Sequence, residues 1–147
     1  MSKKTKIRKF DNGAFRDTSD GKYDYFGFRN PLIEQSFAKY MHEHRKMSDG
    51  TYRDADNWWA GWDKEISLQS MIRHLEDLQA IQAGLIVFEL RYNGGVHKIY
   101  LTGGIEKANE KVKEWKESDI GFKWITAEDC LNAIRFNSGA YLLQELK

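Results

Sequence analysis

The chain has 147 residues, a length that suits one domain with room for a modest second lobe. Its 23 basic and 22 acidic residues give a formal net charge of +1, which argues against a strongly basic nucleic-acid-binding domain. The single cysteine, Cys130, excludes an intramolecular disulfide, so a reducing cytoplasm is the expected setting. The sequence contains no run of ~18 apolar residues, the length that a membrane-spanning helix needs. A secretory signal requires an apolar segment after its basic start, and none follows here.

The near-neutral charge combines a basic start with an acidic body. Five basic residues lie within residues 1–9, and the remaining 138 residues carry 18 basic and 22 acidic groups, a net charge of −4. Such a basic tail either keeps the chain soluble or contacts an anion or nucleic acid. We therefore treat residues 1–9 as a tail outside the folded core.

The first half of the chain predicts an irregular arm followed by two helices. Residues 10–30 mix glycine, aspartate and aromatic residues without a helical period, so an extended or irregular arm is expected. An Asn-Pro pair at residues 30–31 begins a helix that runs to about residue 46. A loop rich in aspartate and tryptophan over residues 48–65 precedes a second amphipathic helix over residues 67–84.

The second half predicts a β-hairpin, a helix laid on it, and a central helix. Residues 85–91 and 96–102 are rich in β-branched and aromatic residues and flank an Asn-Gly-Gly turn signal. Residues 105–117 place apolar side chains on one face and charged ones on the other, as an amphipathic helix does. Thr126 caps a last helix that is apolar nearly all round and is therefore expected to be central.

Several polar residues fall where the helical pattern predicts at least partial burial. His74 and Asp77 lie one turn apart at the border of an apolar face, where they either line a cleft or simply bond to each other. Asn137 lies in the middle of a buried stripe, and an unpaired buried amide costs ~1–3 kcal/mol. Its partner is a nucleotide base, a ligand-holding side chain or a helix-end carbonyl.

Carboxylates at the start of the last helix have two interpretations. Glu128 and Asp129 either stabilise the positive end of the helix or converge with Asp77 on a Mg²⁺ ion. Such an ion offsets triphosphate charge and activates a water molecule.

Two residues in the loop before the second helix are candidates to contact a phosphate and a base. Arg53 can fork onto a phosphate, and Trp58 can stack on a base. In the alternative, the tryptophans cover the core and Arg53 pairs with a neighbouring aspartate.

Four separated blocks of the sequence, in order, resemble one known family. They are residues 10–24 (FDNGAFRDTSDGKYD), 40–58 (YMHEHRKMSDGTYRDADNW), 73–78 (RHLEDL) and 129–146. The family is the phage-encoded dATP/dGTP diphosphohydrolase-type domain, grouped with the all-α, MazG-like nucleoside-triphosphate pyrophosphatases. The similarity covers about residues 10–80 and 126–147.

The resemblance implies a mainly α fold. The helical NTP-pyrophosphatase-like core comprises residues 10–84 and 125–147, and residues 85–124 look like an inserted lobe made of a β-hairpin plus an amphipathic helix. The implied activity is hydrolysis of a purine deoxynucleoside triphosphate (dATP or dGTP) to the monophosphate and pyrophosphate, with Mg²⁺ or Mn²⁺ as cofactor. The expected compartment remains the cytoplasm, that of the host if the chain is phage-encoded.

The expected site follows from these matches and from the carboxylates above. We expect His74, Asp77 and Asp129 to be catalytic. Metal binding is expected from Asp77, Glu128 and Asp129. Nucleotide binding is expected from Arg53, Asn57, Trp58 and Asn137.

Two further hypotheses remain open. One is a catalytically inactive protein that binds or sequesters a nucleotide, because the broader superfamily uses E-x-x-E and E-x-x-D helices, with more carboxylates than this chain offers. The other is an accessory protein that docks a partner through the charged helix at residues 105–117 and the hairpin edge of the lobe at residues 85–124. We also expect a homo-oligomer, because relatives in this superfamily build sites between subunits.

Overall fold

The computed structural model describes residues 7–13, 15–17 and 21–147, and the chain divides into two compact units, Met1–Gln35 and Ser36–Lys147. In the first unit, strands β1 (Ile7–Lys9) and β2 (Phe15–Asp17) form an antiparallel hairpin. The end of the expected tail is thus a strand, and its first six residues lie outside the described part of the chain.

Two of the helices start at predicted or newly found capping residues. Helix α1 (Pro31–Glu43) begins as predicted, because the Oδ1 atom of Asn30 accepts a hydrogen bond from the Leu32 N–H at 2.9 Å. A short 3-10 helix, η1 (Asn57–Ala60), lies in the tryptophan-rich loop. Helix α2 (Lys64–Gln82) starts earlier than expected, since Asp63 is its N-cap.

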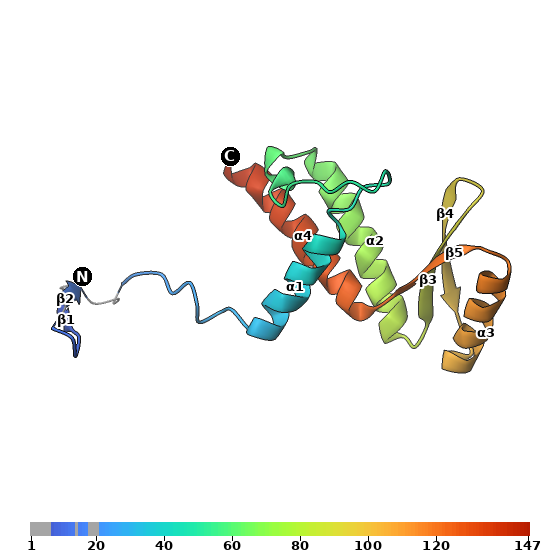
Figure 1. The fold of residues 1–147 in the computed structure, drawn as a ribbon, viewed down its shortest axis with the longest axis horizontal. Coiled ribbons are helices and arrows are strands. Elements are labelled where there is room, and N and C mark those ends of the chain that lie inside the picture. The colour runs from blue at the N-terminus through green and yellow to red at the C-terminus, as the bar shows by residue number, and fades with distance from the viewer. Residues whose placement is uncertain (1–6, 14, 18–20) are drawn as a thin grey trace. The chain divides into compact units, whose positions relative to one another are not determined.

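The helices α2 and α4 (Ala127–Leu146) pack along each other, as Figure 1 shows. The predicted cap of α4 is confirmed, because Thr126 and Asp129 form a reciprocal capping box.

A three-stranded antiparallel sheet follows α2 directly. The predicted hairpin is confirmed as β3 (Ile86–Tyr92) and β4 (Gly95–Leu101), and α3 (Gly104–Glu117) is the predicted amphipathic helix. A third strand, β5 (Gly121–Ile125), was not predicted and pairs with the other edge of β3, so the strand order is β4-β3-β5.

The two faces of this sheet contact different partners. One face packs against α3 through a core of Phe88, Leu90, Ala108 and Trp115. On the other face, Val87 and Ile125 pack with Cys130 of α4 and with Leu78 of α2. In Figure 1 the sheet accordingly stands between α3 and the pair formed by α2 and α4.

The prediction of a mainly α fold is wrong. The described residues form four α-helices and a three-stranded antiparallel sheet, which is an α+β architecture. The physical reason is strand β5, whose alternation sends Phe122 and Trp124 to the α3 side and Ile125 to the helix side. Because Val87 and Ile125 share a core cluster with α2 and α4, the sheet belongs to the same packed unit as these helices.

Within residues 7–13, 15–17 and 21–147, no helix combines the length and the apolar character that a membrane crossing would need.

Candidate active site

A cavity of about 360 Å³ lies between helices α1, α2 and α4 and one face of the sheet. Helix α2 contributes His74 and Asp77 to its lining, and helix α4 contributes Asp129 and Asn137. All four were singled out from the sequence. The remaining charged lining comes from the three strands: Glu89, Arg91, Lys98 and Lys123.

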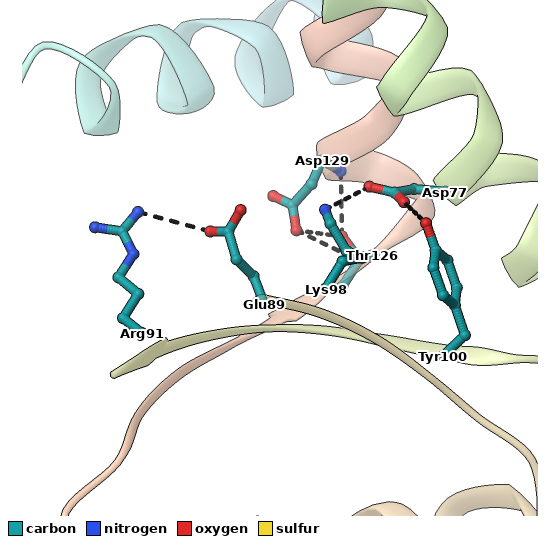
Figure 2. Close-up of polar contacts among 7 residues, drawn as sticks. All are labelled: Asp77, Glu89, Arg91, Lys98, Tyr100, Thr126 and Asp129. Atoms are coloured by element: carbon teal, nitrogen blue, oxygen red, sulfur yellow. Dashed lines mark hydrogen bonds and ion pairs between the residues drawn. The ribbon is translucent and has the colours of Figure 1, made fainter. Parts of the chain in front are cut away.

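The sheet presents its charged residues as a row because of strand register. Glu89 of β3 lies opposite Lys98 of β4 on one side and opposite Lys123 of β5 on the other. Directly opposite residues of antiparallel strands point to the same face, so the three side chains stand together. Arg91 follows two residues later on that face, and its guanidinium lies 3.6 Å from the Glu89 carboxylate (Figure 2).

The Asp77 carboxylate is buried, with 2% of its side chain exposed, and is held by two residues of β4. The Lys98 ammonium and the Tyr100 hydroxyl each donate to it at 2.7 Å (Figure 2). A buried carboxylate needs such partners, because an uncompensated charge away from water is strongly destabilising. Burial, together with the hydrogen bond to Asp77, raises the pKa of Tyr100 to about 12.

His74 lies beside this pair without sharing its bonds. In the described structure, Asp77 binds Lys98 and Tyr100, so the predicted alternative of a direct bond between His74 and Asp77 is not found. Burial lowers the pKa of the His74 imidazole, although the Asp77 charge acts in the opposite direction. His74 is therefore a mainly neutral imidazole at neutral pH, able to accept a proton.

On α4, Asp129 and Asn137 line the cavity and also form hydrogen bonds close to or within the helix. One carboxylate oxygen of Asp129, Oδ2, accepts from the Thr126 N–H at 3.0 Å in the capping box. The amide of Asn137, 7% exposed, donates to the carbonyl oxygen of Ala133 at 2.8 Å, a partner inside the same helix and not the helix-end carbonyl considered from the sequence.

The three expected metal ligands do not come together. Asp77 and Asp129 line the same cavity, but Glu128 is outside its lining and accepts a hydrogen bond from Ser36 of α1 at 2.6 Å. Across the described ranges of the chain, no group of three or more His, Cys, Asp or Glu side chains is placed to hold a metal ion. The residues therefore do not fit a metal ion held by protein ligands alone.

A smaller aromatic pocket of about 130 Å³ adjoins the cavity. The two share Tyr40, His44 and Phe136 in their linings. Expected nucleotide-binding residues line this pocket: Arg53, Asn57 and Trp58.

The walls of the aromatic pocket are held by ring contacts and backbone bonds. The Trp58 and Trp62 rings both contact Phe136, with centroids 6.0 and 5.6 Å apart. Arg53 donates to the backbone carbonyl of His44, and among the residues that the structure describes no ion pair joins its guanidinium to an aspartate. The structure thus brings seven of the eight predicted site residues to two adjoining cavities, Glu128 being the exception.

Sequence reasoning missed the residues that the sheet contributes. The signal was the period of two in the strands, which puts Glu89 and Arg91 on one face of β3 and Phe88 and Leu90 on the other. The short segment Gly121–Ile125 shows the same alternation, with Lys123 between Phe122 and Trp124. Aligning these strands in register would have predicted that Glu89, Lys98 and Lys123 lie side by side on one face of the sheet.

Comparison of the chain with protein-family models, with curated proteins and with solved structures finds no match.

Proposed function

We propose that this chain is a nucleotide pyrophosphohydrolase that cleaves a purine deoxynucleoside triphosphate to the monophosphate and pyrophosphate. The observation that carries the proposal is that His74, Asp77, Asp129 and Asn137, expected from the phage diphosphohydrolase resemblance, line one cavity. The adjoining aromatic pocket supports it, because rings such as Trp58 suit a stacked base.

In this proposal the base occupies the aromatic pocket and the phosphates occupy the larger cavity. Mg²⁺ or Mn²⁺ arrives on the phosphates as part of the substrate, which agrees with the preference of Mg²⁺ for phosphate oxygens and water over an all-protein cage. The bound ion offsets phosphate charge.

His74 then acts as the general base. Its neutral imidazole accepts a proton from a water molecule that attacks the α-phosphorus. A bond forms between the water oxygen and the α-phosphorus, and the bond to the bridging oxygen breaks with release of pyrophosphate. Asp77 acts through Lys98 and Tyr100, which it holds in place.

The test is a panel of deoxynucleoside and ribonucleoside triphosphates with Mg²⁺ or Mn²⁺, read for both binding and pyrophosphate release. We expect dATP or dGTP to give equimolar monophosphate and pyrophosphate. His74→Asn should lower kcat by about 10²-fold. His97→Asn, an exposed histidine on β4 that stacks on Tyr92, is the matched control and should keep full activity. A folded sample that neither binds nor cleaves any nucleotide would contradict the proposal.

A second candidate is a protein that binds or sequesters a nucleotide without turnover. It is favoured by the Asp77 carboxylate, which is already held by Lys98 and Tyr100, and by the separation of Glu128 from the cavity. Tight binding in the same panel without pyrophosphate would select this candidate.

We also propose that the chain is a homo-oligomer in the cytoplasm. Leu68, Ile72 and Leu75 form an apolar stripe along α2, and each is about half exposed. Contiguous apolar surface of this kind is typical of protein interfaces. Light scattering should give at least twice the chain mass of 17.2 kDa, and Ile72→Glu should give the monomer. A monomeric parent protein would contradict this part.

A further inference from the structure

The charged row on the sheet is unevenly paired. Lys98 is committed to Asp77 at 2.7 Å. Arg91 has, among the described residues, only the 3.6 Å ion-pair contact with Glu89, and 71% of its side chain is exposed. Lys123 lines the cavity and forms no ion pair with any residue that the structure describes.

This leaves two cations facing the cavity, one weakly paired and one unpaired. The helix side offsets them only in part. Asp77 is already met by Lys98, whereas Asp129 keeps its charge, because the groups that bind one of its oxygens, the N–H and hydroxyl of Thr126, are neutral. Glu89 lies opposite Lys123 and 3.6 Å from Arg91, but neither cation forms a closer ion pair with any described residue, so both side chains can turn toward an anion in the cavity.

The chemistry of the two side chains suits phosphate. A guanidinium presents a planar fork that binds two phosphate oxygens, and an ammonium is a compact point charge for another phosphate group. They stand on neighbouring strands, β3 and β5, flanking Glu89, so they can contact different groups of one extended anion. The cavity that they line shares residues with the aromatic pocket, which places this anion within reach of a base bound there.

We propose that Arg91 and Lys123 bind the polyphosphate chain of the nucleotide, so that the sheet, and not the helices alone, forms the substrate site. This inference rests on the proposed function for the identity of the nucleotide. The anion site itself is a property of the sheet and can be tested with inorganic tripolyphosphate, which has no base or sugar. Binding should persist in EDTA, because the contacts come from protein cations.

The experiment measures tripolyphosphate binding by calorimetry in EDTA at low and high salt, for the parent protein and three variants. We expect Arg91→Gln and Lys123→Gln each to weaken binding about tenfold, and we expect the parent affinity to fall with added salt. Lys113→Gln, on the exposed side of α3, is the matched control and should bind as the parent does. Unchanged thermal unfolding of the variants would show that the loss is not a folding defect.

The outcomes separate this inference from the proposed function. Absence of tripolyphosphate binding to the parent, or equal binding to all variants, would overturn the inference. If dATP is cleaved with an unchanged KM by Lys123→Gln and Arg91→Gln, the inference is wrong and the proposed function stands. If nucleotides are neither bound nor cleaved while the tripolyphosphate losses are seen, the anion site stands and the nucleotide assignment fails.

Discussion

The two faces of the three-stranded sheet are made by the same strands but differ in the side chains they carry and in what those side chains contact. On the α3 side, Phe88 and Leu90 are 0% and 3% exposed, and the Phe88 ring meets the Trp115 ring edge-on at 4.9 Å. On the helix side, Glu89, Lys98 and Lys123 form a charged row that borders a cavity.

The difference shows how one strand serves two purposes. Residues two apart share a face, so a single strand can place apolar side chains in a core and charged side chains in a cavity. We therefore expect substitutions on the α3 side to change the free energy of unfolding. Substitutions in the charged row on the helix side should act mainly on ligand binding, except where a buried charge depends on them. Val87 and Ile125, on the same face, belong to the core with α2 and α4.

The largest expected effect is on the apolar face. Phe88→Ala should lower the free energy of unfolding by about 3–5 kcal/mol, because it removes the ring that packs against Trp115, Phe122 and Trp124. Urea denaturation followed by circular dichroism measures it. Val96→Ala, at a position 59% exposed on β4, is the control and should stay within about 0.5 kcal/mol. Equal midpoints for the two variants would show that this face is not the core.

The Asp77–Lys98 pair lies on the helix side of the sheet, where a buried charge makes substitutions affect stability as well as binding. Lys98→Met should cost ~2 kcal/mol, because it leaves a carboxylate with 2% exposure without its cation. Asp77→Asn should cost only ~1 kcal/mol, because the Lys98 side chain is 31% exposed and its ammonium can reach water. The same urea titrations compare them, and a greater cost for Asp77→Asn would contradict the burial of the carboxylate.

Alkaline pH tests the Tyr100 contact. The folded-state pKa of Tyr100 is raised to about 12 by burial and by its bond to Asp77, above the ordinary value of 10. A raised pKa stabilises the fold fully below pH 10 and loses that contribution as the pH rises towards 12. Tyr100→Phe should cost ~1 kcal/mol at neutral pH and should make the loss of stability between pH 10 and 12 shallower.

Some loss of stability between pH 10 and 12 is expected even in Tyr100→Phe. Tyr40, with a pKa raised to about 12 by its own burial, and Cys130, with one raised to about 11, titrate in the same range. Identical slopes in the parent and Tyr100→Phe, measured by thermal unfolding across this range, would count against the contact with Asp77.

The smallest expected effect is at the cap of α4. Thr126→Ala should cost about 0.5–1 kcal/mol, because the Asp129 N–H loses the Thr126 hydroxyl as its acceptor. Thr102→Ala, at an exposed threonine after β4, is the matched control. A difference of zero between the two midpoints would argue that the capping box contributes nothing.

Much of the fold could be predicted because the signals are local. The Asn30 cap, the hairpin at Asn93 and Gly94, and the Thr126 cap each lie within a few residues of what they determine. Strand β5 could not be found this way. Its five residues become a strand because β3 offers an edge about thirty residues earlier in the chain, and the strand order is a tertiary property.

The residues of the candidate site also fall into two groups, those that a local sequence pattern predicts and those that depend on tertiary packing. The spacing of His74 and Asp77 on one helix, and the place of Asn137 in a buried stripe of another, could be obtained from the helical period, whereas Asp129 came from its position at a helix start. The partners of Asp77 lie on β4 and depend on how the sheet docks onto α2, which no local pattern contains.

The most direct measurement is a two-dimensional NMR titration of the ¹⁵N-labelled protein with dATP. We expect backbone shift changes at His74, Lys123 and Asn137, on α2, β5 and α4, with the exposed face of α3 unaffected. No change at saturating dATP, or changes confined to α3, would contradict the assignment of the polar face of the sheet as the ligand site.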